Sequence, residues 1–397
     1  MFHKMPFILA AIILFVVLFD GLIPLEVKSS LYALSLTIKS AIIFILPFII
    51  FMLLFKTLSQ LASNATKLIF MILAGVCCSN FLSTMISYKI GSAIFQFDLS
   101  LALPNEAVGL APAWNLTLPK LVANDIAMFS GVILGILFSL FNRPVADKIS
   151  RYFETVVDIT LRLVINLIPF FVAGFVIKLI HDKVMQNIIQ DYALIFALVA
   201  VAQFGYITFI YLVASRFRLS RLSSAVKNMI PAAISGFGSM SSAASMPLTI
   251  IGTEKNTNNP NLTRLVIPAT VNVHLIGDCF AIPIFAFAVM KNFGVAEPAF
   301  MAYLVFALYF VLAKFSVAAV PGGGILVMLP ILESHLGFNG EMASLITALY
   351  ILFDPVITCA NVYGNGAFAL ALSKLQGLLQ SDNGTRDVLG AKGEAAG

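Results

Sequence analysis

Residues 354–365 read Asp-Pro-Val-Ile-Thr-Cys-Ala-Asn-Val-Tyr-Gly-Asn and lie inside a long apolar segment. Four polar side chains recur there at helical spacing and therefore share one helix face: Asp354, Thr358, Asn361 and Asn365. A carboxylate at membrane depth is costly, so such a residue is by default a candidate for a functional site. The stretch predicts a membrane helix with a binding site on one face. Alternatively, the polar stripe only forms hydrogen bonds to neighbouring helices. That interpretation explains a stripe led by a carboxylate less well than a binding site does.

The composition of the whole chain indicates a membrane protein. Of 397 residues, 60% are hydrophobic and 11% are charged, whereas soluble globular domains average roughly 25% charged residues. Because so few charges cannot cover a water-facing surface, the composition excludes a cytosolic enzyme, a disordered scaffold and a nucleic-acid-binding protein. The four cysteines lie in apolar runs without metal-ligand spacing, so we expect neither a zinc site nor a disulfide framework.

The apolar segments divide into an ordinary set and an interrupted set. A membrane helix needs about 20 residues, and six such runs come first: 6–25, 31–55, 66–96, 124–142, 155–181 and 191–215. The four later segments are interrupted by Gly, Pro, Ser and Asn: 231–250, 264–290, 300–337 and 343–375. Irregular backbone at membrane depth is tolerated only where protein buries it or water reaches it. We therefore predict an all-α polytopic membrane protein whose site lies in the interrupted part.

Two of the interrupted segments predict re-entrant helical hairpins. Residues 238–247, Gly-Ser-Met-Ser-Ser-Ala-Ala-Ser-Met-Pro, would place the hydroxyls of Ser241 and Ser242 at a tip that meets a ligand. The alternative is a close-packed interface of small residues. Residues 320–324, Val-Pro-Gly-Gly-Gly, break any helix. They lack the Gly-Lys-Ser/Thr ending of a phosphate-binding loop, which favours a flexible second tip that gates a site.

The positions of the cationic residues predict an orientation. Cations fall on alternate sides of the spans, in these groups: Lys4; Lys56 and Lys67; Arg143, Lys148 and Arg151; Arg216, Arg218, Arg221 and Lys227. The positive-inside rule then places the N-terminus in the cytoplasm, unless these cations only anchor helix ends. The tail from Gln380 is polar and Gly-rich, and we expect it to be a disordered cytoplasmic end.

Four motifs, at residues 241–247, 269–274, 320–324 and 354–365, follow one another along the chain in the order found in the dicarboxylate/amino acid:cation symporter family. The chain therefore resembles this family, which has the glutamate transporter fold. Ser-Ser-Ala-Ala-Ser-Met-Pro is similar to the family's first hairpin tip, and Val-Pro-Gly-Gly-Gly to its second. Residues 269–274, Ala-Thr-Val-Asn-Val-His, stand where the family has Asn-Met-Asp-Gly-Thr. Residues 354–365 resemble the substrate-binding stretch of helix eight. The likeness covers roughly residues 230–375, and the earlier spans agree in number and orientation.

The resemblance implies a transporter with about eight transmembrane helices plus two re-entrant hairpins. A transport domain would slide against a scaffold by an elevator mechanism in each protomer of a homotrimer. The expected division is 1–215 for the scaffold and trimer contacts, 228–378 for the transport-domain core and 379–397 for a cytoplasmic tail. Helices 3 and 6 are expected to be shared with the transport domain. The expected location is the plasma membrane, the inner membrane in a bacterium, with both termini cytoplasmic.

The family motif also implies roles in the substrate site. Asp354 matches the aspartate that holds the substrate's amino group, Asn361 the asparagine at the α-carboxylate, and Thr358 a neighbouring contact. Acidic-substrate members carry an arginine where this chain has Ile357, and a second buried carboxylate without that partner would be costly. We therefore predict a neutral, small or aliphatic amino acid as substrate. The hairpin tips complete the expected site: Ser241, Ser242, Val320, Pro321, Gly322 and Gly324.

The cation sites depart from the family pattern. His274 replaces a sodium-ligating aspartate of helix seven, and Asn365 replaces an aspartate of helix eight. Thr270 and Asn272 remain as candidate ligands of a bound Na⁺, together with backbone carbonyls of the second hairpin. A histidine titrates near neutral pH, so a proton can replace a sodium ion, unless His274 only hydrogen-bonds in the core. Asp278 would restore a carboxylate if this segment has a shifted register. No other cofactor is expected.

Other functions compete with cation-coupled symport of a neutral amino acid. An exchanger or a dicarboxylate transporter of the same fold, or an uncoupled channel, would use similar hairpins, although Asp354 favours a substrate with an amino group. An intramembrane aspartyl protease would pair Asp278 with Asp354. However, residues 275–278, Leu-Ile-Gly-Asp, lack the first glycine of Gly-x-Gly-Asp, and Phe353 replaces the expected tyrosine. We therefore expect no enzyme activity.

Overall fold

The computed structural model describes residues 5–63, 67–96, 109–119, 121–182, 185–257, 259–317 and 322–394. Every regular element in these ranges is a helix, as the sequence predicts. The first half of the chain contains α1 (Met5–Phe19), the 3-10 helix η2 (Asp20–Leu22), α2 (Leu25–Ser63), α3 (Lys67–Gln96), α4 (Asn124–Phe141), α5 (Arg143–His181) and α6 (Met185–Ala214). The second half contains α7 (Leu219–Ser239), α8 (Ser242–Thr257), α9 (Pro260–Thr270), α10 (Ile276–Asn292), α11 (Phe300–Lys314), α12 (Gly323–Leu336) and α13 (Gly340–Glu394).

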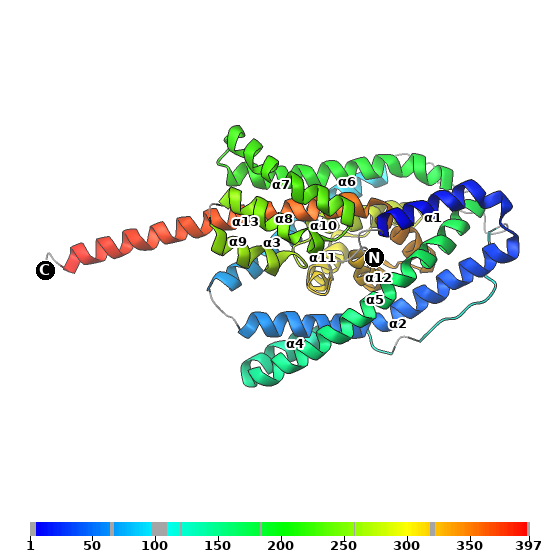
Figure 1. Cartoon of the computed structure of the whole chain (residues 1–397), viewed down its shortest axis with the longest axis horizontal. Helices are drawn as coiled ribbons and strands as arrows, with labels where there is room; N and C mark the ends of the chain where they lie inside the picture. Colours follow the sequence, from blue (N-terminus) through cyan, green and yellow to red (C-terminus); the bar gives the residue numbers. More distant parts are fainter. Residues whose placement is uncertain are drawn as a thin grey trace.

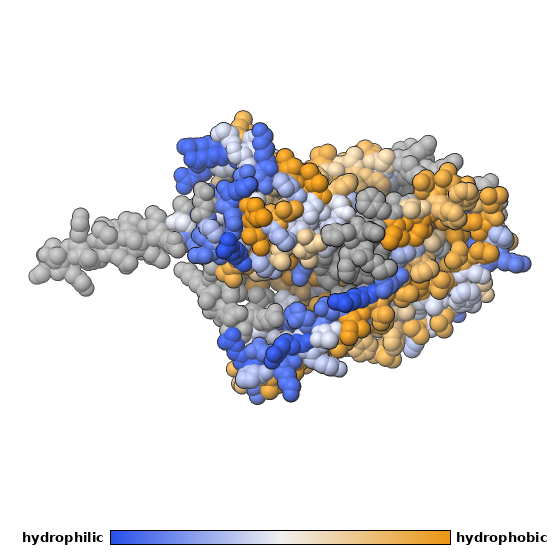
Figure 2. Space-filling view, in the orientation of Figure 1, coloured by the Kyte–Doolittle hydropathy of each residue, from blue (hydrophilic) through white to orange (hydrophobic). Residues whose placement is uncertain are grey.

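The surface of the molecule suits a lipid environment. Among the described residues, three helical stretches are long and apolar enough to cross a membrane: Phe70–Gln96, Tyr192–Ala214 and Gly340–Gly377. Shorter apolar stretches lie in α2, α4, α5, α11 and α12. Figure 2 shows apolar side chains over much of the visible face, whereas hydrophilic ones gather mainly at the end from which the C-terminus leaves. Many exposed side chains are large and apolar, such as Phe70, which a water-facing surface would not favour.

The helices pack in two groups. α2 packs mainly on α4 and α5, and α1 packs on α5; in Figure 1 these helices occupy the lower and right parts of the molecule. By contrast, α3 packs on α10 and α11, and α6 packs on α13 and α10. These two helices therefore lie with the second half of the chain, although they belong to the first half by sequence.

Glycines bring the helices of the first group close together. A Cβ atom built on Gly131 would lie 2.8 Å from the carbonyl oxygen of Phe51, and one on Gly135 would lie 2.7 Å from that of Phe55. Both carbonyls belong to α2 and both glycines to α4. Small residues at such contacts let membrane helices gain van der Waals packing, so these positions determine how tightly α2 and α4 can approach.

Replacing Gly174 of α5 by valine (G174V) is expected to destabilise the protein. A Cβ atom at this position would overlap the backbone carbonyl of Leu31 in α2. Overpacking of this kind lowers the free energy of unfolding by about 1–3 kcal/mol, which the melting temperature of the purified protein would report. G205V is the matched control, because Gly205 is exposed and nothing lies within 4 Å of that Cβ position. Equal melting temperatures for G174V and the wild type would contradict the close α2–α5 contact.

The second half contains two helical hairpins. α7 and α8 pack along each other and turn at Met240, whose φ of 49° is left-handed. The Ser241 hydroxyl then accepts a hydrogen bond from the Ala244 N–H at 3.2 Å, which satisfies a free donor at the start of α8. α11 and α12 form the second pair. The helices on either side of both predicted tips thus pack in pairs, and residues 318–321 of the second tip lie outside the described residues.

A broken helix and a long helix complete this half. α9 ends at Thr270 and α10 begins at Ile276, so the non-helical residues 271–275 include most of the motif at 269–274. α13 runs along α6, α7, α8 and α10. It continues as a helix to Glu394, and the prediction of a disordered tail from Gln380 is therefore wrong. Helical hydrogen bonds are local, and residues 385–394 contain good helix formers such as Arg, Leu, Ala, Lys and Glu.

Candidate functional site

Asp354 lies in α13 at the point where the second hairpin reaches that helix. Its side chain is buried, and its Oδ2 accepts a hydrogen bond from the Gly322 N–H at 2.9 Å. Its Oδ1 accepts from the Thr358 hydroxyl at 3.1 Å. Gly322 has a φ of 72°, which glycine adopts without strain, and this conformation presents its N–H to the carboxylate. Two neutral donors hold this buried carboxylate, and neither neutralises its charge.

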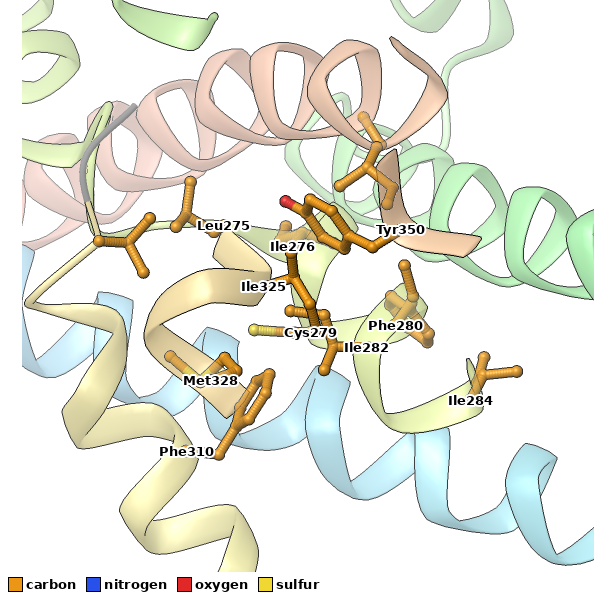
Figure 3. Close-up of a cluster of buried hydrophobic side chains, with 14 of the residues drawn as sticks. Leu275, Ile276, Cys279, Phe280, Ile282, Ile284, Phe310, Ile325, Met328 and Tyr350 are labelled. Carbon is orange, nitrogen blue, oxygen red and sulfur yellow. The ribbon is translucent and has the colours of Figure 1, made fainter. Parts of the chain in front are cut away.

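A second buried carboxylate, that of Asp278 in α10, has a cationic partner. Its Oδ2 lies 2.9 Å from Nζ of Lys314 in α11, and the exposed fractions of the two side chains are 2% and 0%. Its Oδ1 accepts hydrogen bonds from the Tyr350 hydroxyl at 3.0 Å and from Nδ2 of Asn361 at 3.3 Å. Figure 3 shows Tyr350 beside the apolar side chains of Ile276 and Ile325. Asp278 therefore lies at a meeting point of α10, α11 and α13.

Lys314 and Tyr350 belong to this site, although none of the sequence motifs includes them. Lys314 is 36 residues from Asp278 along the chain, and only the hairpin fold brings the two together. A signal was available, because Lys314 interrupts an apolar run at 300–337 and an intramembrane cation is as costly as a carboxylate. The sequence predicts that Asp278 could replace a missing cation ligand. In the structure its carboxylate pairs with the ammonium group of Lys314, and its part in cation coupling stays a prediction.

Asn361 lies on the same face of α13 as Asp354, about two helical turns further along, and contacts α10 at Asp278. Its Oδ1 accepts a hydrogen bond from the Gly277 N–H at 2.8 Å, while its Nδ2 donates to Asp278. These two bonds fix the orientation of the side-chain amide and leave one Nδ2 hydrogen for another acceptor. Ile357, one turn before Asn361 on α13, is fully buried. The expected substrate-site residues of helix eight are thus close together, and their roles stay predictions.

The structure describes all of the first hairpin tip but only the part of the second that begins at Gly322. Ser241 and Ser242 are both buried at the first tip. This hairpin meets α13 beside Thr358, since a Cβ atom on Gly236 would lie 3.4 Å from the Thr358 carbonyl oxygen. At the second tip, Gly324 of α12 packs so closely on Asp278 that a Cβ atom would overlap the carboxylate. Val320 and Pro321 lie outside the described residues.

One predicted coupling residue, His274, lies in a buried polar cluster with α3. Nε2 of His274 lies 2.9 Å from the Ser79 hydroxyl oxygen, and Nδ2 of Asn80 donates to the Val273 carbonyl at 2.7 Å. Within the described part of the chain, three buried polar atoms here have no hydrogen-bond partner: Nδ1 of His274, Oδ1 of Asn80 and Oδ1 of Asn365. Such atoms are costly unless a proton, water or ion satisfies them. Ser79 and Asn80 were missed, although they interrupt the apolar run 66–96.

The two residues proposed to hold Na⁺ lie in different environments. Thr270 is buried, and its hydroxyl donates to the Val266 carbonyl at 2.9 Å within α9. Asn272 is exposed. At the break that follows Thr270, the Thr270 carbonyl accepts hydrogen bonds from the N–H groups of Val273 and His274 at 3.0 and 2.8 Å. A sodium ion near these two residues stays a prediction.

Comparisons with known proteins agree with this arrangement. A profile described as the sodium:dicarboxylate symporter family matches residues 6–375. A protein named serine/threonine transporter SstT from Bifidobacterium adolescentis is 24% identical over 342 residues, which are 81% of this chain and 79% of that protein. The protein of the same name from Enterococcus faecalis is 22% identical over 315 residues, 75% of this chain and 74% of that protein. An excitatory amino acid transporter from Onchocerca volvulus is 29% identical over 141 residues, 35% of this chain and 28% of that protein.

Proposed function

Because this chain belongs to the sodium:dicarboxylate symporter family, we propose that it carries a neutral amino acid across the membrane by cation-coupled symport. Membership confirms the resemblance seen in the four motifs. The family consists of multi-pass membrane transporters and not of enzymes, so the protease alternative is rejected. Several relatives are named serine/threonine transporters, which supports a small neutral substrate here.

One observation carries the substrate proposal: a buried carboxylate that has no cationic partner among the described residues lies about one turn from a buried aliphatic side chain. Asp354 accepts only neutral donors in the described contacts, so the ammonium group of an amino acid can complete its charge pairing. Ile357 is fully buried and apolar. A substrate with a side-chain carboxylate would have to desolvate that charge against Ile357 without compensation, and a neutral side chain would not.

We propose that the transport domain comprises the second half of the chain together with α3 and α6. The packing of α3 on α10 and of α6 on α13 supports this division. A cavity of about 320 Å³ lies between α2, α5, α10 and the start of α13. Across it, Nζ of Lys39 in α2 donates to the Ser344 hydroxyl at 3.2 Å. An interface with polar contacts and a cavity suits two bodies that move relative to each other better than a packed core does.

The remaining features of the proposal follow from the family resemblance and from the charges between the helices. Residues 1–215 without α3 and α6 would form the scaffold and the contacts of a homotrimer, and 379–397 would follow the transport domain into the cytoplasm. The two hairpins would be re-entrant and act as gates in an elevator mechanism. The protein would lie in the plasma membrane with both termini cytoplasmic, since cations border the α4–α5 and α6–α7 connections.

Uptake into liposomes tests the proposed function. The purified protein is reconstituted, and uptake of labelled serine, threonine and alanine is compared with that of aspartate, glutamate and succinate under an inward sodium or proton gradient. We expect neutral amino acids to accumulate at least about 10-fold faster, a difference worth about 1.4 kcal/mol in transition-state free energy. A preference for acidic substrates would contradict the proposal, and counterflow without any gradient would indicate exchange.

A substitution at His274 distinguishes proton coupling from sodium coupling. H274Q keeps a hydrogen-bonding group where Nε2 meets Ser79 but cannot titrate. If His274 carries the coupled proton, uptake driven by a pH gradient falls at least about 10-fold in H274Q, whereas uptake driven by a sodium gradient does not. Equal uptake by H274Q and the wild type under both gradients would remove the histidine from the coupling mechanism.

A further inference from the structure

We propose that the buried ammonium group of Lys314 is a built-in cation at Asp278, in place of a monovalent cation from solution. The inference deepens the proposed function, on which it rests for the meaning of coupling. It concerns a residue that none of the family motifs includes. The structural basis is the closed environment of the ion pair, which is shielded from solvent and connected to the substrate site.

The Lys314–Asp278 pair is excluded from water on all sides. The exposed fractions of the two side chains are 0% and 2%, and Nζ lies 2.9 Å from Oδ2 of Asp278. Nζ also lies 4.5 Å from the centre of the Phe310 ring, within range of a cation–π contact. Taking both charges out of water is costly, and only their mutual neutralisation makes such burial tolerable. Asp278 therefore requires a positive charge at this place.

The pair lies where both arms of the second hairpin meet α10 and α13. Lys314 is the last residue of α11, and Gly324 of α12 packs directly on the Asp278 carboxylate. Tyr350 and Asn361 of α13 donate to the other carboxylate oxygen. The ammonium group thus neutralises a carboxylate that four helices share. A cation that arrived from solution would have to bind at the same point to close the same hairpin.

The pair acts on the substrate site through Asn361. One hydrogen bond, 3.3 Å long, separates the Asp278 carboxylate from the Asn361 amide, which the proposed function assigns to the substrate's α-carboxylate. If Lys314 were absent, the uncompensated charge of Asp278 would repel that α-carboxylate across a region of low dielectric constant. With Lys314 in place the group is neutral overall. The lysine would therefore be a positioning residue that permits anion binding next to a buried aspartate.

This assignment predicts that removing the ammonium group opens a cation site. In K314A the Asp278 carboxylate is left unpaired in a space that a lysine side chain occupied, and oxygen atoms of Asp278 and Tyr350 line it. Oxygen ligands and one negative charge are what a small hard cation prefers. We expect K314A to melt at a lower temperature than the wild type in choline chloride. Sodium or lithium chloride at equal ionic strength should raise its melting temperature by at least ~3 °C more than that of the wild type.

The double variant D278N/K314M is the matched control. It removes both charges and keeps an amide as hydrogen-bond acceptor, so its response to sodium should equal that of the wild type. Three results would overturn the inference: no extra cation response in K314A, an equal extra response in the double variant, or failure of K314A to fold in any of the salts. In each case no free cation replaces the ammonium group at Asp278.

The measurement uses full-length protein and contains no substrate, so its outcome is separate from that of the uptake assay. An extra sodium response in K314A together with preferred uptake of acidic substrates would leave the cation inference standing and reject the proposed substrate class. In reconstituted K314A, driven by a proton gradient in choline, the KM for the neutral amino acid should be at least about 10-fold above that of the wild type under the same conditions, and sodium or lithium should remove this difference. A change confined to kcat would contradict the positioning role.

Discussion

Replacing Asp354 by asparagine (D354N) is expected to lower uptake of the neutral amino acid at least about 100-fold, because a buried charge pair with the substrate's ammonium group is worth about 3–5 kcal/mol. The change is nearly isosteric. The asparagine Oδ1 can still accept a hydrogen bond from the Gly322 N–H, as Oδ2 of Asp354 does at 2.9 Å. The fold should therefore persist while the charge is lost.

Two measurements separate loss of binding from loss of folding in D354N. The melting temperature without substrate should stay near that of the wild type, and the increase that substrate causes in the wild type should be absent. D158N is a matched control, because Asp158 is exposed on α5 and undergoes the same chemical change away from the site. Unchanged uptake by D354N would show that the substrate has no amino group at this carboxylate.

Replacing Ile357 by arginine (I357R) is expected to reverse the substrate preference. A guanidinium group at this buried position would pair with a side-chain carboxylate through two parallel hydrogen bonds, so uptake of aspartate or glutamate should appear. With a neutral substrate the same charge would be buried without a partner. Uptake of serine or threonine should therefore fall at least about 10-fold, and the ratio of acidic to neutral uptake should rise at least about 100-fold.

The controls for I357R concern size and folding. Ile357 is fully buried, and arginine is the larger side chain, so I357M tests a change of shape without a charge; it should keep the neutral preference. If I357R is unstable alone, aspartate should raise its melting temperature, because the substrate supplies the missing carboxylate. Continued preference for neutral substrates in a folded I357R protein would place the substrate side chain away from position 357.

The order of the helices could be predicted from the sequence, because lipid imposes simple rules on it. An apolar run of sufficient length must be helical in a membrane. Gly and Pro in the middle of such a run break it, as near Gly322, where the structure has non-helical backbone. The break at 271–275 contains neither residue; polar Asn272 and His274 interrupt the apolar run there. The polar stripe on α13 was equally evident, since the spacing of Asp354, Thr358 and Asn361 places them on one face of any helix.

The partners of the site residues could not be predicted in this way. His274 meets Ser79 of α3, which is 195 residues away along the chain, and spacing within one helix says nothing about a neighbouring helix. The tail beyond Gln380 shows the opposite error, because its composition suggested disorder where the structure has a helix. Composition describes how a segment interacts with solvent on average, whereas helical hydrogen bonds depend on local backbone geometry.

Membrane location, the interrupted helices and the polar stripe led by Asp354 could all be inferred from the sequence, because solvent exclusion and helical periodicity act on one segment at a time. The state of the second carboxylate depends instead on the three-dimensional packing. The sequence suggests that Asp278 could be an additional cation ligand. The fold instead places Nζ of Lys314 2.9 Å from Oδ2 of Asp278. Whether a buried charge is free or paired depends on residues distant in sequence, since electrostatic compensation acts through space and not along the chain.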